Sequence, residues 1–377
     1  MNKLRIAIIC NSYPTKKNKS NQIFIKNIKN ELEKNSVNCD VYYNKIYDLW
    51  FNPTAYKNVA STVIKYTFFF TGLFSIIGKL KSYNILNPHG VMFSGFSAVI
   101  IKRFSKIPVI LFIHGGDLNL YNSSSALYRK IYDFTVLHSD RVIVNSLDIK
   151  NKLILYTRIN GKNVEIVSPG ISLENFYPLQ KEQIEFFKEK YNILKNKVVI
   201  LFVGNAIKRK GIDILLDALS ELKAHYLSQL NVILCTDGPE LEQVKNRIIS
   251  TPGFSKSIKI LDKMEQSKLN VLYNIADIFV LPSRQEPLGL VGLEALATGT
   301  PVIGSRVGGI PEYINNDNGF LFDPNNPKEL RDLLINIIVN PELIKKFSSN
   351  MGKRYMEHSI NKSVLKLKSI FNSFVIS

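Results

Sequence analysis

The chain has 377 residues, of which 45% are hydrophobic and 21% charged, a balance typical of an ordinary soluble globular protein. This length exceeds one typical core and predicts two domains of about 150–200 residues each. Three scattered cysteines in apolar stretches argue against a disulfide framework or a zinc site and indicate buried, reduced thiols. The apolar stretch near the N-terminus is too short for a secretory signal peptide.

The formal net charge of +18 is unevenly distributed along the chain. Residues 1–180 hold 23 Lys and Arg against 10 Asp and Glu, which gives +13, whereas residues 181–377 carry only +5. A basic first half indicates an anionic partner such as a membrane surface, a phosphorylated substrate or nucleic acid, although genome bias also produces lysine-rich chains. No nucleic-acid-binding motif and no interleaving of aromatic with basic residues appears, so nucleic acid is not the expected partner.

Short apolar runs that predict strands alternate with longer helical patterns, such as the one at 212–226. In the first half the predicted strands are 4–10, 39–43, 108–113, 141–146 and 164–168. A lysine-flanked apolar run at 66–78 has 13 residues, fewer than the roughly 20 that span a bilayer. It predicts either a helix packed on the core or an interfacial, lipid-binding helix.

A looser stretch at about 170–195 separates this series from a second one. The second series of predicted strands is 197–204, 231–236, 257–261, 277–283, 301–305 and 319–322, with consecutive helices from about 327 onward. Near-continuous Val, Ile and Leu strands between helices predict parallel sheets covered on both faces. The expected fold is therefore α/β, with two doubly wound Rossmann-like domains, 1–180 and 181–377, that face a cleft and bind ligands beyond the carboxyl ends of their strands.

The segment "EPLGLVGLEALATGTPVIGS" (286–305) predicts a helix over about 288–298, with Pro287 in its first turn and a stop at Gly299. The free N–H groups and positive dipole end of such a helix would suit an anion such as a diphosphate. Two glutamates bracket this end, and a buried carboxylate requires hydrogen-bonding partners. Glu294 could accept hydrogen bonds from two vicinal ribose hydroxyls and Glu286 from sugar hydroxyls; the alternative is a satisfied core acid and an N-cap.

A second phosphate-binding segment follows the strand at 197–204. Lys208, Arg209 and Lys210 form a basic loop there, and Gly211 begins the next helix. Such a loop could neutralise a leaving diphosphate. Neither GxxxxGK[ST] nor a GxGxxG after a strand occurs, which argues against a Walker A loop and a dinucleotide oxidoreductase.

The two glutamates form the pattern E-x7-E within "EPLGLVGLEALATGTPVI". Supporting segments include "FVGNAIKRKG", "LYNIADIFVLPSRQE", "RVGGIPEYINNDNGFLF" and, in the first half, "NPHGVMFSGFSAVIIKRFSKIPVILFIHGGDL". Together they resemble the retaining glycosyltransferases of family 4, whose fold is GT-B, from about residue 4 to 340. The resemblance implies an acceptor-binding first domain and a nucleotide-sugar-binding second domain, and the last helix, about 355–377, could pack back on the first.

The resemblance implies a role for each matching residue. Glu294 would bind the nucleotide ribose, Glu286 the donor sugar and Lys210 the diphosphate. His114 would lie near the donor sugar and the transferring centre, and Asp117 would contact the acceptor or orient the site. The backbone amides that would hold the sugar and the diphosphate are those of Leu288, Gly289 and Leu290.

Three positions depart from the family pattern. Asn205 stands where the family commonly has an arginine, and Arg209 could replace it. The N-terminal loop reads Lys19–Gln22 instead of a glycine-rich sequence, and Ser172 stands where an aspartate is frequent. These departures concern the details of donor binding rather than the fold.

The resemblance further implies transfer of a hexose from a nucleotide diphosphate sugar with retention at the anomeric carbon, without a metal and without a cofactor. Front-face attack, with the leaving phosphate as base, is the expected route. The basic first half and the lysine-flanked run at 66–78 indicate work at the cytoplasmic face of the cell membrane, where the expected acceptor is a lipid-linked saccharide in surface polysaccharide synthesis. Transfer to a soluble acceptor and a sugar-nucleotide epimerase of similar fold are the alternatives.

Overall fold

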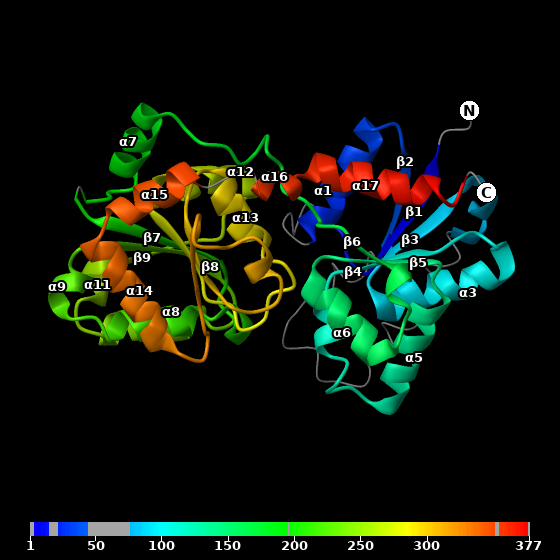
Figure 1. Cartoon of the computed structure of the whole chain (residues 1–377), viewed down its shortest axis with the longest axis horizontal. Coiled ribbons are helices and arrows are strands. Elements are labelled where there is room, and N and C mark those ends of the chain that lie inside the picture. Colours follow the sequence, from blue (N-terminus) through cyan, green and yellow to red (C-terminus); the bar gives the residue numbers. More distant parts are fainter. Residues whose placement is uncertain (1–3, 15–21, 44–75, 195, 351–353, 376–377) are drawn as a thin grey trace. The chain divides into compact units, whose positions relative to one another are not determined.

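The protein consists of two compact α/β units (Figure 1). The computed structural model describes residues 4–14, 22–43, 76–194, 196–350 and 354–375. Unit 1 comprises Met1–Gly170 and Ile360–Ser377, and unit 2 comprises Ile171–Ser359. Each unit contains one six-stranded sheet in which every pair of neighbouring strands is parallel. The predicted pair of doubly wound parallel sheets is thereby confirmed.

The sheet of unit 1 has the strand order β2-β1-β3-β4-β5-β6. Its strands are β1 (Arg5–Cys10), β2 (Asn38–Tyr43), β3 (Ile85–His89), β4 (Ile110–Ile113), β5 (Arg141–Val144) and β6 (Val164–Ile166). The main helices are α1 (Ile23–Lys34), α3 (Phe96–Ser105), α5 (Ala126–His138), α6 (Leu147–Thr157) and α17 (Ile360–Asn372). Short helical segments are η2 (Leu80–Ser82), η3 (Val91–Gly95), α4 (Gly116–Asn119) and η4 (Gly161–Asn163).

Helix α17 joins unit 1 although it follows the whole of unit 2 in sequence. Its buried residues Val364, Leu367 and Phe371 lie in one core cluster with Ile6 and Ile8 of β1. Because these apolar side chains recur at helical spacing, one stripe of α17 covers the sheet next to α1 (Figure 1). Unit 1 is therefore built from two separate segments of the chain, and one boundary in the sequence does not divide the two units.

The sheet of unit 2 has the order β12-β11-β10-β7-β8-β9. Its strands are β7 (Val198–Asn205), β8 (Leu230–Asp237), β9 (Ile258–Leu261), β10 (Ile278–Leu281), β11 (Val302–Ser305) and β12 (Gly319–Phe322). The main helices are α7 (Lys181–Lys190), α8 (Ile212–Ser220), α10 (Leu241–Ser250), α12 (Gln266–Ile275), α13 (Leu290–Ala297), α14 (Pro327–Val339) and α15 (Glu342–Asn350). Short segments are η5 (Lys208–Lys210), α9 (Ala224–Leu227), α11 (Phe254–Ser257), η6 (Ile310–Glu312) and α16 (Arg354–Glu357).

Both faces of the unit 2 sheet are buried. Alternate residues of β7 enter different cores: Ile200 and Phe202 pack with α8 and α14, and Val199, Leu201 and Val203 pack with α12 and α13. Successive side chains of a strand point to opposite faces, so a continuous apolar run such as 198–203 requires helices on both sides. This explains why the strands of unit 2 are recognisable in the sequence.

The structure corrects four details of the sequence prediction. Strand β3 is not among the predicted strands, because polar Asn87 and His89 interrupt its apolar pattern although both are buried. The stretch predicted as loose holds helix α7. The pattern at 212–226 is two helices, α8 and α9, because extended Lys223 separates them. Helix α13 begins at Leu290, so Pro287 lies before the helix and not in its first turn.

The apolar run at 66–78 lies mostly outside the described residues, which begin again at Ile76, so its helical prediction is not addressed. Ile76 itself is buried in the core that includes α3. Among the described helices none is long and apolar enough to cross a membrane. The three cysteines are buried and unpaired, as the sequence predicts.

Candidate functional site

A loop of unit 2, residues 282–289, connects the end of β10 to the start of α13. Its backbone is held by the neighbouring strand β11 and the turn after it: Ser305 Oγ donates to Ser283 O (2.6 Å), and Gly309 N–H donates to Glu286 O (3.2 Å). A Cβ on Gly308 would collide with the Glu286 carbonyl, and the φ of Gly308 is +55°. The loop is therefore locked at the carboxyl end of the sheet, the edge at which parallel α/β sheets bind ligands.

The N-terminal end of α13 is shaped by Gly289 and Tyr313. Gly289 has φ +89°, and its carbonyl accepts a hydrogen bond from the buried Tyr313 hydroxyl (2.9 Å). A side chain on Gly289 would both strain this backbone and meet that hydroxyl. Within the described part of the chain, the N–H groups of Leu288, Gly289 and Leu290 have no hydrogen-bond acceptor. Unpaired amides at the positive end of a helix form a site suited to an anion.

Lys210 and Glu286 form an ion pair next to this helix end. Lys210 Nζ lies 2.5 Å from Glu286 Oε2, and the two side chains are 17% and 9% exposed. Ser283 Oγ donates to the same carboxylate oxygen (3.1 Å). The structure therefore brings together two of the predicted site residues that lie 76 positions apart in sequence.

The remaining basic residues of η5 are also engaged. Arg209 donates from Nη1 to Gln285 O (3.2 Å), and Lys208 pairs with Asp213 (2.9 Å). Arg284, which the sequence prediction does not include, makes two hydrogen bonds to Asp213 (2.7 and 2.9 Å) and donates to Lys208 O (2.9 Å). Asp213 has a lowered pKa because its hydrogen bonds and charge pairing with Arg284 and Lys208 outweigh its desolvation. A charged network thus fixes the loop that carries Lys210.

Asn205 and Glu294 occupy different environments. Asn205 ends β7 and is exposed. Glu294 lies inside α13 at 5% exposure, where its two oxygens accept hydrogen bonds from Gln266 Nε2 and Tyr273 Oη, each at 3.0 Å. Burial raises the pKa of Glu294, and these two hydrogen bonds oppose that rise. Each carboxylate oxygen therefore accepts one hydrogen bond from the protein and retains a second lone pair for a further donor.

Unit 1 carries the other two predicted site residues just after β4. His114 is partly exposed, and its ring stacks on that of Phe112 with the ring centroids 4.4 Å apart. The ring of Phe24 is tilted relative to His114, with a centroid distance of 4.5 Å. Its Nε2 lies 2.9 Å from His89 Nδ1, and its buried Nδ1 has no hydrogen-bond partner in the described structure. Burial lowers the pKa of His114 to about 3, with the Asn145 side chain acting in the opposite direction. The imidazole is therefore neutral at physiological pH.

Asp117, in the short helix α4, supports the neighbouring backbone. Its Oδ2 accepts a hydrogen bond from Val91 N–H (2.7 Å), at the turn between β3 and η3. Burial raises the pKa of Asp117, and the Val91 hydrogen bond opposes that rise. The predicted contact with an acceptor stays a prediction.

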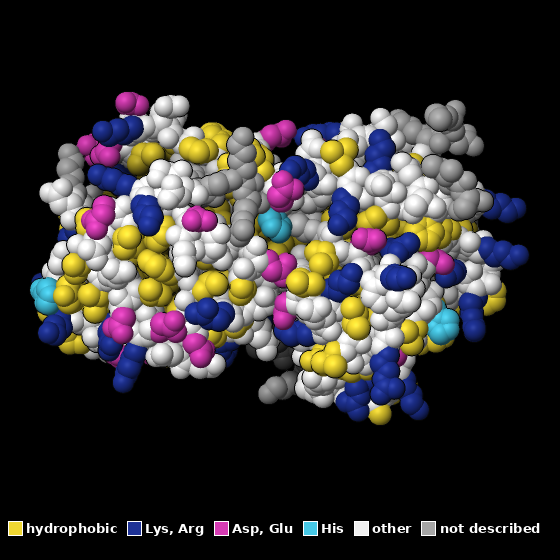
Figure 2. All heavy atoms as spheres, viewed as in Figure 1, with side chains coloured by type: hydrophobic (Ala, Val, Ile, Leu, Met, Phe, Trp, Pro, Cys, Tyr) yellow, Lys and Arg dark blue, Asp and Glu magenta, His cyan; other side chains and the backbone are white. Residues whose placement is uncertain are grey.

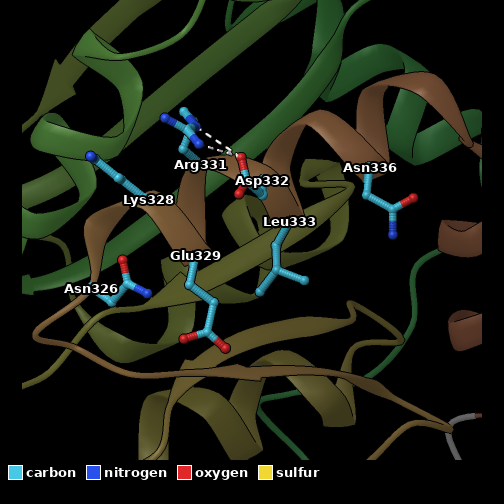
Figure 3. A pocket seen from close by; sticks show the side chains of 7 residues that line it. All are labelled: Asn326, Lys328, Glu329, Arg331, Asp332, Leu333 and Asn336. Atoms are coloured by element: carbon cyan, nitrogen blue, oxygen red, sulfur yellow. Dashed lines mark hydrogen bonds and ion pairs between the residues drawn. The ribbon is translucent and has the colours of Figure 1, made fainter.

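The surface differs between the units. In Figure 2, Lys and Arg predominate on the visible face of unit 1, whereas both signs of charge intermix on unit 2. A pocket of about 500 Å³ on the outer side of α14 is lined by Lys328, Glu329 and Arg331 among others, and Arg331 pairs there with Asp332 (Figure 3). It contains none of the predicted site residues. Among the described residues no cluster of three or more His, Cys, Asp or Glu could hold a metal ion.

Two family models match consecutive parts of the chain. The model described as Glycosyltransferase Family 4 matches residues 22–175, and the model described as Glycosyl transferases group 1 matches residues 183–354. A D-inositol 3-phosphate glycosyltransferase of Corynebacterium diphtheriae is 30% identical over 310 residues, which cover 77% of this chain and 70% of that protein.

Solved structures share the fold at lower identity. A sucrose-phosphate synthase from Thermosynechococcus elongatus superposes with a TM-score of 0.82 at 19% identity, over 100% of both chains. Anabaena HepE, in complex with UDP-glucose, superposes with a TM-score of 0.75 at 18% identity, over 97% of this chain and 99% of HepE. The matched models, the relative and the two six-stranded parallel sheets agree: the chain belongs to the glycosyltransferases of the GT-B fold.

Proposed function

We propose that the protein transfers a hexose from a nucleotide diphosphate sugar to an acceptor hydroxyl with retention at the anomeric carbon. The observation that carries this proposal is the set of three free amides at the start of α13 beside the Lys210–Glu286 pair. A diphosphate presents several anionic oxygens, which match backbone N–H groups at a helix N-terminus and an ammonium group. The HepE structure, which contains UDP-glucose, supports a donor of this class.

In this proposal each residue of unit 2 has one task. The amides of Leu288, Gly289 and Leu290 and the Lys210 ammonium bind the diphosphate, and Glu286 accepts hydrogen bonds from the hexose. Glu294 uses its remaining lone pairs for the ribose hydroxyls. Asn205, at the end of β7, and Arg209, in the following loop, flank the diphosphate. The Arg209 guanidinium, which donates to the carbonyl of Gln285, can turn toward it.

The reaction forms a bond between the acceptor oxygen and the anomeric carbon and breaks the bond from that carbon to the diphosphate. The diphosphate leaves with the electron pair, and the acceptor proton passes to its departing oxygen. Neither glutamate is assigned as a nucleophile, because Glu286 is neutralised by Lys210 and Glu294 is enclosed by Tyr273 and Gln266. Catalysis then depends on positioning and on stabilising the leaving charge, and His114 contributes a hydrogen bond near the transferring centre.

Transfer without a metal is part of the proposal. The positive charge that a diphosphate requires comes from Lys210, Arg209 and the end of α13. Turnover should therefore survive EDTA, and a requirement for Mg²⁺ or Mn²⁺ would contradict this part of the proposal.

The decisive experiment is titration calorimetry with UDP, GDP and ADP, followed by turnover with the matching nucleotide sugars. One nucleotide should bind in the wild type and bind weakly in Lys210→Ala. NMR of the product should find the anomeric configuration of the donor. Absence of binding for all three nucleotides counts against donor recognition, and an inverted product counts against retention alone.

A lipid-linked acceptor at a membrane surface is the second part of the proposal. Residues 77–81 and the end of α3 pack on one core cluster and expose basic and apolar side chains together. Phe104 is 85% exposed, and Arg103, Lys106, Lys79 and Lys81 are exposed as well. Basic residues near an anionic leaflet contribute about 1 kcal/mol each, and an aromatic side chain can enter the interface.

Vesicle sedimentation tests the membrane part. Binding should require anionic lipid, weaken with salt, and fall when Lys79 and Lys81 are replaced by glutamate or Phe104 by serine. Lys328→Glu, a substitution on unit 2, is the matched control. Equal recovery on neutral and anionic vesicles would instead favour a soluble acceptor.

A further inference from the structure

A chain of two buried polar side chains on strand β3, Asn87 and His89, leads to His114. Asn87 and His89 lie two positions apart on β3 and are 1% and 3% exposed. His89 is paired in register with Phe112 of β4, and His114 follows the end of that strand. Buried polar groups inside a parallel sheet are costly unless they are hydrogen-bonded, so this arrangement requires a full account of its hydrogen bonds.

The orientation of Asn87 fixes the first proton of the chain. Asn87 Nδ2 donates to Ile110 O (2.7 Å), so its Oδ1 faces His89 Nε2 at 3.1 Å. An amide oxygen only accepts hydrogen bonds, and His89 Nε2 must therefore carry a proton. Burial and the neighbouring His114 lower the pKa of His89 well below its usual value, so the ring is neutral and its Nδ1 carries a lone pair.

The second proton follows from the first. His89 Nδ1 lies 2.9 Å from His114 Nε2, and an unprotonated nitrogen can only accept there. His114 Nε2 must then be the donor, which leaves His114 Nδ1 unprotonated. Carbonyl Ile110 O thus determines, through two side chains, which nitrogen of His114 holds the proton.

Two acceptors next to each other lack a donor at the far end of this chain. His114 Nδ1 is buried and has no hydrogen-bond partner among the described residues, and the same holds for Asn145 Oδ1. Asn145 is 6% exposed and adjoins His114, because its Nδ2 donates to His114 O (3.4 Å). Native proteins rarely leave two neighbouring buried acceptors unsatisfied. A hydroxyl carries one proton, so a ligand hydroxyl would satisfy one of these two acceptors.

We propose that Asn87 and His89 are positioning residues that hold His114 in the tautomer with a free Nδ1, which accepts a hydrogen bond from a sugar hydroxyl of the substrate. The contact with a sugar hydroxyl rests on the proposed function. The tautomer of His114 does not, because it follows from the hydrogen bonds of Asn87 and His89. The opposite tautomer would let His114 Nδ1 donate to Asn145 Oδ1, but it would leave His89 Nε2 unprotonated against Asn87 Oδ1.

Nitrogen-15 NMR of histidine-labelled protein tests the tautomer without any turnover. The chain has five histidines, so single variants assign the resonances. In the wild type, His114 should have an unprotonated Nδ1 and a protonated Nε2. In His89→Phe, His114 loses its acceptor and should shift toward the form protonated at Nδ1. A wild-type His114 protonated at Nδ1, or an unchanged tautomer in His89→Phe, overturns the proposal.

Kinetics test the link to catalysis. In His89→Phe, kcat should fall on the order of tenfold or more, while the dissociation constant of the nucleotide stays unchanged, because a misplaced group affects the reacting geometry. The double variant Asn87→Leu/His89→Phe removes both buried polar groups, so it leaves no unpaired amide and should fold while showing the same loss. Unchanged kcat in both variants overturns the positioning role.

The control for both measurements is His138→Gln. His138 lies at the end of α5, where its Nδ1 hydrogen-bonds with the Phe134 carbonyl, and it should alter neither the His114 resonances nor kcat. If the wild type transfers no sugar, the proposed function fails and the positioning role fails with it, while the NMR result still decides the tautomer assignment.

Discussion

The two units have the same sheet architecture, but the candidate site residues of unit 2 are held by ion pairs and those of unit 1 by hydrogen bonds between neutral groups. Unit 2 gathers charges: Lys210 with Glu286, and Arg284 and Lys208 with Asp213. Unit 1 gathers neutral groups: His89 and His114 have lowered pKa values, and Asn87 completes the chain. In both units the candidate residues lie just beyond strands whose carboxyl ends share one edge of a parallel sheet.

The difference follows the proposed ligands. A diphosphate carries its own charge, and the ion pair between Lys210 and Glu286 keeps either group from lying buried without a counter-charge. A sugar hydroxyl is neutral, so a desolvated imidazole with one free lone pair suits it better than a charged group. The comparison therefore predicts that substitutions in unit 2 alter donor affinity and that substitutions in unit 1 alter turnover.

The largest expected effect is that of His114→Ala on turnover. In the proposed mechanism this variant removes the nitrogen that accepts a hydrogen bond from the sugar, so kcat should fall by about 10²-fold or more, on the scale of a positioned side chain in catalysis. Nucleotide affinity measured by calorimetry should be unchanged, and circular dichroism should confirm folding. If a folded His114→Ala variant turns over as fast as the wild type, His114 is not a site residue. If it binds nucleotide more weakly, the predicted assignment of donor affinity to unit 2 and turnover to unit 1 is wrong.

Lys210→Ala should mainly weaken donor binding. The loss should be about 1.5–3 kcal/mol, the scale of hydrogen bonds to charged groups, because the diphosphate loses a cation and meets an unpaired Glu286. Lys208→Ala is the matched control: it lies in the same loop, its side chain is 72% exposed, and it pairs with Asp213. If calorimetry gives equal losses for both variants, the effect is general electrostatics and not a specific contact.

The change of the unfolding free energy with pH should show that the histidines of unit 1 are neutral in the folded state. The folded pKa of His114 is about 3, below the roughly 6.5 of an unfolded histidine. Between these values the unfolded chain binds a proton that the folded chain does not, so stability falls as the pH falls. The slope should be up to about 1.4 kcal/mol per pH unit for this residue.

Urea unfolding between pH 7 and pH 5 measures this slope in the wild type and in His114→Phe. Carboxylates with raised pKa values, such as Glu294 and Asp117, act with the opposite sign, but they are present in both proteins. The slope should be smaller in His114→Phe. Equal slopes would mean that His114 has the same pKa in the folded and unfolded states, and the contrast between a neutral and a charged site would be lost.

The smallest expected effect is that of Tyr313→Phe, which removes the hydroxyl that donates to Gly289 O. The free energy of unfolding should fall by about 0.5–1.5 kcal/mol, with a modest loss of donor affinity because the start of α13 loosens. Tyr132→Phe in unit 1 is the control: Tyr132 is fully buried, but its hydroxyl has no partner among the described residues. This control should be neutral or stabilising, and equal destabilisation by both would mean that the Gly289 contact contributes nothing.

Several features of the fold are local enough to be predicted. The continuous apolar strands and the helical patterns of unit 2 predict a sheet covered on both faces, and the structure agrees from β7 to β12. Strand β3 escapes prediction because Asn87 and His89 break its pattern, and only their hydrogen bonds across the sheet make burial tolerable. The start of α13 is misplaced for a similar reason, since Gly309 and Tyr313, distant in sequence, hold residues 286–289 outside the helix.

The sequence by itself determines the fold class and the approximate position of helix α13, because apolar periodicity and a glycine before a helix are local signals. Through motif resemblance it also predicts Lys210, Glu286, Glu294 and His114 as site residues. Only the tertiary structure decides their partners: Glu286 with Lys210, Glu294 with Tyr273, and His114 with His89. The physical reason is that protonation and pairing depend on desolvation and on contacts between residues far apart in the chain, which no local pattern records.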